Sequence, residues 1–197
     1  MHPGDINQNG DPSDTASRSA ELQGSYLCEY LRANQVPWLD PAYRVPYMAL
    51  TAAEIPERPV PVGLQIIEVP PGDTELARLF DDTAARSFNI SYPAEVYSSG
   101  ITDDGSIRFF LGMLTTRVGG EPQPVTTMAL IDYHDTHQLA EIEDVTTVAR
   151  YRNRGMAAAT IAHVLQLTRG SFEVIFLSPT TKAIKFYHKL GFLMLRP

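Results

Sequence analysis

The sequence predicts an α/β protein built on a mixed β-sheet, and three stretches carry that prediction. Residues 140–159 have the pattern of a strand, a tight turn and the start of a helix. Residues 106–118 and 125–133 have strand patterns, and the loop between them contains a glycine pair, which predicts an antiparallel hairpin. After the helix the chain returns to a short apolar strand at 173–177. A strand, a helix and a strand in succession predict a right-handed parallel crossover.

The first 63 residues divide into two expected segments. Residues 1–20 are rich in Gly, Pro, Asn, Asp and Ser, so we expect a disordered or loosely docked tail. Residues 21–63 are expected to be helical and then extended. Apolar spacing predicts a short helix at 21–34, and repeated prolines predict extended chain after it, with a short strand at 47–51. The main domain is expected at 64–197.

The helices and first strand of this domain follow from local patterns. Residues 64–69 have the pattern of a strand, and Asp73 is the expected N-cap of a helix with one apolar stripe. The pattern at 92–99 is ambiguous, and a second short helix is one interpretation of it. Further helices are expected at 153–169 and 181–190, each followed by a glycine.

The strand at 138–149 is expected to alternate strictly between its two faces. One face then carries Glu141, Glu143, Val145 and Thr147, and the other carries Ile142, Asp144, Thr146 and Val148. Both glutamates are therefore expected on the same side of the sheet, with Asp144 pointing away from them as a structural residue.

The turn after this strand has the composition of an anion site. Gly155 stands at its apex, small residues follow, and Arg150, Arg152 and Arg154 place positive charge around it. The first turn of a helix leaves about four backbone N–H groups without intrahelical partners, and the helix dipole adds positive potential there. The turn therefore predicts binding of an anionic ligand that carries a pyrophosphate.

Two motifs resemble those of a known family. The pattern R-x-x-G-x-A at 152–157, after a strand ending V-x-T, is similar to the acetyl-CoA signature of the GNAT superfamily of N-acetyltransferases. The pattern A-x-x-x-Y-x-x-x-G-F at 183–192, one helix and one strand later, is similar to the second recurrent motif of that family. The resemblance covers about 64–197 and leaves residues 1–60 outside it.

The resemblance implies a GNAT-like fold, acetyl-CoA as co-substrate and direct acetyl transfer to an amine. It implies that the pantetheine arm pairs with the strand near 145–147, where the sheet of family members splays open, and that the pyrophosphate lies on the turn. The implied cofactor-binding residues are Val145, Thr146, Thr147, Arg152, Asn153, Arg154, Gly155, Met156, Ala157, Ala158 and Thr180. Thr180 departs from relatives that carry an Asn there to contact the pantetheine.

Three side chains are candidates for proton transfer. Tyr187 occupies the position where the family often has the tyrosine that protonates the leaving thiolate. Its alternative role is packing beside the cofactor or in the core. Glu141 and Glu143 are candidate general bases, because a carboxylate in a partly buried cleft has a raised pKa. Their alternative roles are a solvated strand face or a partner for an arginine, and many family members have no dedicated base.

Composition excludes several other classes. The net charge of −7 argues against general binding to nucleic acids or anionic membranes. The single cysteine, Cys28, permits no internal disulfide and suits a reducing compartment. We expect a cytoplasmic protein, since the sequence shows neither an apolar run of about 20 residues nor a signal peptide. His134 and His137 lack further ligands, so no metal site is expected.

The C-terminal end is short for the family, which usually closes its sheet with a two-strand hairpin. We expect residues 26–50, with one Trp and several Tyr, to pack near that edge, within one chain or exchanged across a homodimer.

The function expected from these observations is transfer of an acetyl group from acetyl-CoA to a primary amine of a small molecule or peptide. The alternative is a catalytically silent module of the same fold that binds CoA as a sensor or interaction partner.

Overall fold

The computed structural model describes residues 46–51, 55, 57–89, 105–133 and 138–195. The expected tail at 1–20, the helices expected at 21–34 and 92–99, and the pair His134 and His137 lie outside the described residues.

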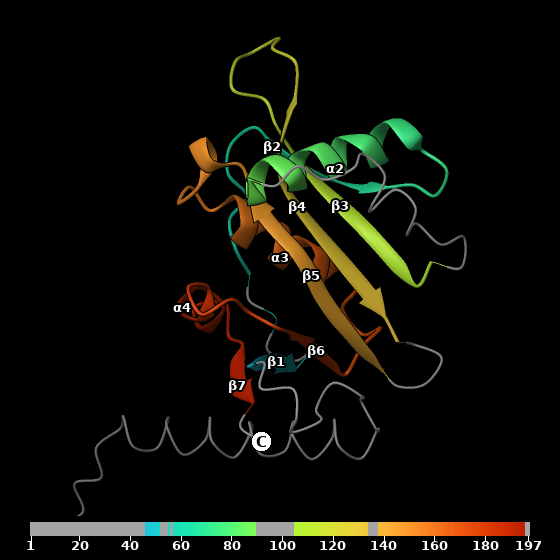
Figure 1. The fold of residues 1–197 in the computed structure, drawn as a ribbon, viewed down its shortest axis with the longest axis vertical. Helices are drawn as coiled ribbons and strands as arrows, with labels where there is room; N and C mark the ends of the chain where they lie inside the picture. Colours follow the sequence, from blue (N-terminus) through green and yellow to red (C-terminus); the bar gives the residue numbers. More distant parts are fainter. Residues whose placement is uncertain (1–45, 52–54, 56, 90–104, 134–137, 196–197) are drawn as a thin grey trace, which may run out of the picture.

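A mixed sheet of seven strands, in the order β2-β3-β4-β5-β6-β1-β7, forms the centre of the molecule (Figure 1). The strands are β1 (Tyr47–Thr51), β2 (Leu64–Val69), β3 (Ile107–Leu114), β4 (Gln123–Asp132), β5 (Leu139–Thr147), β6 (Val174–Leu177) and β7 (Leu193–Leu195). The predicted hairpin is the antiparallel pair of β3 and β4. The predicted parallel neighbours are β5 and β6, and the other neighbouring strands run antiparallel. The mixed α/β sheet expected from the sequence is confirmed.

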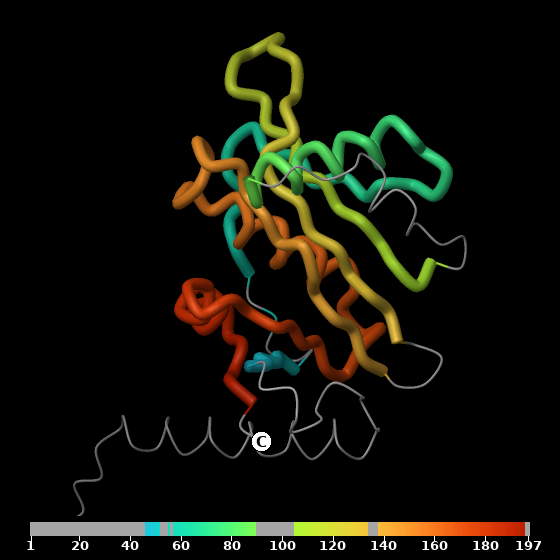
Figure 2. The backbone as a smooth tube through the Cα atoms, in the orientation of Figure 1, coloured from blue at the N-terminus to red at the C-terminus, as the bar shows by residue number. Residues whose placement is uncertain are grey.

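Strand β1 comes from the segment before the main domain and lies inside the sheet. It runs antiparallel to both of its neighbours, with Met48 opposite Leu177 of β6 and Met194 of β7. Met48, Ala49 and Leu50 are fully buried. The strand expected at 47–51 is therefore confirmed, and it supplies the pairing that β7 would otherwise lack, within one chain (Figure 2).

Two helices cover opposite faces of the sheet, and a third lies between β6 and β7 in the chain (Figures 1 and 2). They are α2 (Thr74–Phe88), α3 (Met156–Leu167) and α4 (Ile184–His188). Alternate residues of the strands point to the two sides. Ala129 packs with Phe80 of α2, whereas its neighbours Met128 and Leu130 pack with Ile161 of α3. We call these sides the α2 face and the α3 face.

The helix boundaries follow from capping and backbone conformation. The Asp73 carboxylate accepts a hydrogen bond of 3.0 Å from the backbone N–H of Leu76, which confirms the predicted cap of α2. Helix α3 begins at Met156 rather than Asn153, because Asn153 and Gly155 have φ angles of +60° and +79°. A right-handed helix does not include such angles.

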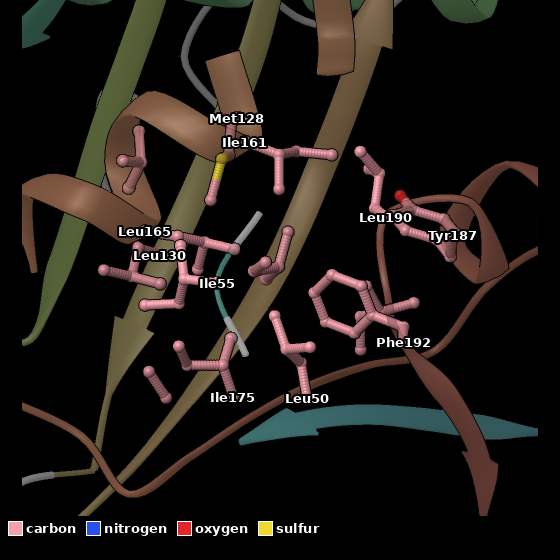
Figure 3. Close-up of a cluster of buried hydrophobic side chains, with 14 of the residues drawn as sticks. Leu50, Ile55, Met128, Leu130, Ile161, Leu165, Ile175, Tyr187, Leu190 and Phe192 are labelled. Carbon is pink, nitrogen blue, oxygen red and sulfur yellow. The ribbon is translucent and has the colours of Figure 1, made fainter. Parts of the chain in front are cut away.

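The largest buried cluster lies on the α3 face (Figure 3). It joins residues from β1, β4, α3, β6 and the C-terminal segment, including Leu50, Leu130, Leu165, Ile175 and Phe192. Residues far apart in the sequence thus share one core, and the strand from the N-terminal segment contributes directly to it.

Candidate active site

Strand β5 carries a β-bulge just before the turn. Ala129 of β4 stands opposite Glu143 of β5, but Thr127 stands opposite Thr146. Two steps along β4 therefore match three steps along β5, so β5 holds one extra residue. Asp144, which lies within the bulge, has a left-handed φ of +50°.

The expectation of strict alternation along β5 is wrong beyond Glu143, because the bulge exchanges the faces to which the following side chains point. Glu141 and Glu143 share the α2 face, as expected, but Thr146 joins them there and its hydroxyl lies 2.6 Å from that of Thr127. Val145 packs against the core cluster of the α3 face, and Thr147 stands on that face too. Neither residue shares a face with the glutamates. An inserted residue shifts a period of two by one step, which exchanges the faces.

The parallel pairing of β5 with β6 ends beside the bulge. The last paired residues are Glu141 and Phe176, after which β6 ends at Leu177 while β5 continues to Thr147. Within the described residues, the edge of β5 at 142–147 has no strand on its β6 side. Backbone N–H and C=O groups on such an edge are available to a ligand.

A pocket of about 240 Å³ occupies this opening. Its walls come from β5, the segment after β6, helix α4 and the end of α2. It is lined by Phe88, Glu141, Ile142, Glu143, Asp144, Val145, Ser178, Pro179, Thr180, Ala183 and Tyr187. The structure therefore brings together all three proton-transfer candidates, with Val145 and Thr180 beside them. It also places Asp144 in the wall, although that residue was expected to point away.

Glu141 is a buried carboxyl with one neutral partner. Its side chain is 8% exposed, and Oε2 accepts a hydrogen bond of 3.0 Å from the hydroxyl of Tyr133. Burial and, after it, the charge of Glu143 raise the pKa of Glu141, the Tyr133 hydrogen bond lowers it, and the net result is a pKa of about 7. A carboxyl with this pKa exchanges protons near neutral pH.

Glu143 differs from Glu141 in exposure. Its side chain is exposed, and desolvation at the pocket wall followed by the charge of Asp144 raises its pKa. The two glutamates and Asp144 thus give the β5 wall of the pocket three carboxyl groups.

Tyr187 reaches the pocket from α4. Its ring packs edge-on against Phe186 and Phe192 at centroid distances of 5.0 and 5.8 Å, and the side chain is 8% exposed. Figure 3 shows it at the border of the core cluster. Burial alone raises the pKa of Tyr187 to about 12, so the hydroxyl keeps its proton at neutral pH. Tyr187 packs in the core cluster of the α3 face, whereas Glu141 and Glu143 lie on the α2 face. All three line the pocket, because it lies in the gap where β5 and β6 part.

The turn between β5 and α3 exposes its backbone. Residues 152–155 are exposed, Gly155 has φ +79°, and no side chain caps the start of α3. The first backbone hydrogen bond donated within the helix runs from Ala159 to the carbonyl of Gly155. Met156 is buried against the core, while Ala157 and Ala158 are partly exposed. The geometry has the features of an anion site at a helix start.

The three arginines of the turn all contact groups of the protein. Arg152 donates to the backbone carbonyls of Thr147, at 3.0 Å, and Ser87, at 2.7 Å, and so links the turn to the end of α2. Arg150 and Arg154 lie over the ring of Tyr151, at 4.8 and 5.9 Å from its centroid. Arg152 therefore bridges the end of β5 and the end of α2. Its place in the motif did not indicate this role.

Sequence reasoning missed two residues of the site. Ser178 lines the pocket, and the hydroxyl of Tyr133 donates a hydrogen bond to Glu141. Neither residue belongs to a short motif. Tyr133 could be placed at the end of the second hairpin strand from the sequence. That place indicates a contact with Glu141 only once the register of β4 against β5 is known.

Two negative findings concern the described residues alone. None of their helices has the length and apolar character needed to cross a membrane. No group of three or more His, Cys, Asp or Glu side chains among them is arranged to hold a metal ion.

Comparisons with solved structures show the same fold. A GCN5-related N-acetyltransferase from Kribbella flavida is 19% identical, with a TM-score of 0.53, and the match covers 75% of this chain and 53% of that protein. A conserved protein of unknown function from Staphylococcus epidermidis is 16% identical, with a TM-score of 0.57, covering 76% of this chain and 57% of that one. The chain thus spans little more than half the length of both.

An aminoglycoside acetyltransferase from an uncultured soil metagenomic sample is 22% identical, with a TM-score of 0.53. The match covers 65% of this chain and 90% of that protein. A search of the curated proteins found no match. The profile of the acetyltransferase (GNAT) family matches residues 74–192, which is more than half of the chain and includes both motifs. The chain therefore belongs to the GNAT family of acetyltransferases.

Proposed function

We propose that this protein is an acetyl-CoA-dependent N-acetyltransferase that moves an acetyl group directly to a primary amine of a small molecule or peptide. The observation that carries the proposal is the pocket where β5 and β6 part, which is lined by a carboxyl with a pKa of about 7 and by a protonated tyrosine. A group that accepts a proton from the amine and a group that donates one to the leaving thiolate both speed acetyl transfer.

The turn and the free edge of β5 suit the cofactor. The backbone amides of residues 153–158, at the exposed turn and the start of α3, would bind the pyrophosphate, with positive charge from Arg154 nearby. Backbone groups at 145–147 would pair with the pantetheine arm, and Thr180 would line its path. Acetyl-CoA, when bound, supplies the activated thioester.

Glu141 is the best-placed general base. Its pKa of about 7 leaves roughly half of it ionised at neutral pH, and it can accept a proton from an ammonium group directly or through water. Glu143, the other candidate, is exposed, and its charge contributes to the raised pKa of Glu141. We therefore assign proton acceptance to Glu141 and a supporting electrostatic role to Glu143.

Tyr187 is the proposed general acid. With a pKa raised to about 12 it remains protonated, and its hydroxyl can give a proton to a leaving thiolate. Within the described residues nothing accepts a hydrogen bond from this hydroxyl, whose residue lines the pocket.

The acceptor should be cationic before it reacts. Glu141, Glu143 and Asp144 give one wall of the pocket a negative potential that favours ammonium groups. Aminoglycosides, which are polyamines, are the acceptors named for one structural neighbour, so they belong in the first panel together with small diamines and peptide N-termini.

Calorimetric titration with acetyl-CoA, followed by thiol release with this amine panel, tests the proposal. We expect saturable binding and amine-dependent release of CoA. Binding without turnover on any amine would instead support a silent CoA-binding module. Absence of binding at millimolar acetyl-CoA would contradict both.

A further inference from the structure

Tyr133 stands at the end of β4 with its hydroxyl on the carboxylate of Glu141. We propose that Tyr133 is a positioning residue, which holds one oxygen of Glu141 so that the carboxylate keeps a single orientation at the pocket wall. The inference rests on the proposed function, in which Glu141 accepts the proton of the acceptor amine.

The backbone places the two side chains together. Tyr133 follows β4 directly, and its N–H donates to the carbonyl of Leu139 at 3.0 Å, which closes the pair of β4 and β5. Ile131 stands opposite Glu141, so Tyr133, two residues further along, points to the same α2 face. The hydroxyl of Tyr133 then reaches Oε2 of Glu141 at 3.0 Å. Among the described residues this is the one hydrogen bond to the Glu141 carboxylate.

Aromatic packing fixes the ring that makes this bond. Tyr133 stacks on Phe176 with a centroid distance of 6.2 Å and an interplanar angle of 24°. Phe176 is fully buried and is the partner of Glu141 on β6. Tyr47 of β1 meets the same ring edge-on at 6.3 Å. Three strands, one of them from the N-terminal segment, therefore set the direction of the Tyr133 hydroxyl.

Tyr133 stays protonated, and can therefore donate its hydrogen bond, at every pH at which Glu141 changes its charge. Burial first, and then the charge of Glu141, hold the pKa of Tyr133 well above its ordinary value, so the phenol keeps its proton wherever Glu141 titrates. The hydrogen bond lowers the pKa of Glu141 against burial and the charge of Glu143. The ionisable groups that line the pocket with Glu141 are Glu143 and Asp144 on β5 and Tyr187 on α4, and Tyr47 on β1 lies close enough to Tyr133 to raise its pKa.

A purely structural role would give a different response to mutation. If Tyr133 only packed on Phe176, then Tyr133→Phe, which keeps the ring, would leave the titration of Glu141 unchanged. If the hydroxyl holds the carboxylate, the same change raises the pKa of Glu141, because an interaction with its charged form is lost.

The first test is the pH profile of kcat/KM for Tyr133→Phe with an accepted amine. We expect the acidic limb to move up by about 0.5–1 pH unit, which lowers kcat/KM at pH 6.5 by about 3- to 10-fold and leaves the value at pH 9 within about 2-fold of wild type. Tyr47→Phe is the matched control, since Tyr47 packs on the same Phe176 ring and, among the described residues, the hydrogen bond to Glu141 comes from Tyr133. The control profile should not move.

The second test needs no acceptor. The carboxyl carbon of Glu141 is followed by ¹³C NMR against pH in wild type and Tyr133→Phe, with Glu141→Gln to assign the signal. We expect the midpoint to rise by the same 0.5–1 unit as the kinetic limb. An unshifted midpoint would overturn the positioning role. Failure of the wild type to turn over any amine would count against the proposed function, while the NMR titration would still decide whether Tyr133 holds Glu141.

Discussion

The turn after β5 and the pocket beside it are neighbours along the chain, but they are built in different ways. The turn is a continuous segment, residues 152–158, that would bind its ligand through backbone amides and local conformation. The pocket takes its walls from β5, α4, α2 and the segment after β6, and its chemistry depends on side chains placed by distant contacts. The turn should therefore tolerate side-chain changes that leave its backbone alone, whereas single atoms should matter in the pocket.

The largest effect is expected in the pocket, from Tyr187→Phe. The change removes one oxygen and keeps the ring that packs on Phe186 and Phe192. If the hydroxyl protonates the leaving thiolate, kcat should fall by ~10²- to 10⁴-fold with nearly unchanged affinity for acetyl-CoA. Steady-state kinetics and calorimetry measure the two quantities. An affinity that falls as much as kcat would make Tyr187 a packing residue.

The next effect tests how far the pocket depends on remote parts of the chain. Leu50 of β1 is fully buried in the cluster that also contains Tyr187. Leu50→Ala should lower the free energy of unfolding by about 2–5 kcal/mol, since it opens a cavity in the core. Chemical denaturation measures it. Val62→Ala is the control, because Val62 is 98% exposed and should change stability by less than about 0.5 kcal/mol. Equal losses in both variants would contradict the place of β1 in the core.

Glu141→Gln should separate activity from stability. We expect kcat/KM at pH 8 to fall by ~10²-fold and the acidic limb near pH 7 to disappear, because the base is gone. Glu143→Gln should instead keep that limb and move it to lower pH, because the charge of Glu143 helps to raise the pKa of Glu141. If Glu143→Gln abolished the limb, the base would be Glu143.

The same Glu141→Gln variant should lose activity but gain stability at pH 8. The folded-state pKa of Glu141 is raised above its ordinary value of 4.5, to about 7. Its contribution to stability is therefore fully present below pH 4.5 and is lost as the pH rises through 7. Glu141→Gln should be more stable than wild type at pH 8, by on the order of 1–3 kcal/mol, with little difference at pH 4. Thermal unfolding at the two pH values measures this, and a variant less stable at pH 8 would argue against a costly buried charge.

The smallest effect is expected in the turn, from Gly155→Ala. Gly155 has φ +79°, so the added Cβ costs about 1–2 kcal/mol of strain and should weaken acetyl-CoA binding by ~10-fold by distorting the amides. Gly119→Ala is the matched control. Gly119 has φ +74° in the loop between β3 and β4, where a Cβ meets nothing within 4 Å. Both variants should lose similar stability, and weaker binding in both would show that the turn has no special role.

The outcome of sequence analysis follows the same division between local and distant contacts. The α2 cap at Asp73, the strand at 47–51 and the hairpin of β3 and β4 were all predicted, because each depends on residues close together in the chain. The prediction that β5 alternates strictly was wrong beyond Glu143. A bulge depends on how β5 pairs with β4, and composition does not reveal it.

The sequence by itself determined the sheet class, the turn and the family, since short motifs and periodic apolar residues encode them directly. Only the tertiary structure decided that β1 lies between β6 and β7, that Arg152 bridges Thr147 to Ser87, and that Tyr133 holds Glu141. The physical reason is register. A shift of one residue in the pairing of β4 with β5 would turn Tyr133 away from Glu141, and the relative shift of two strands is set by the packing of the whole core.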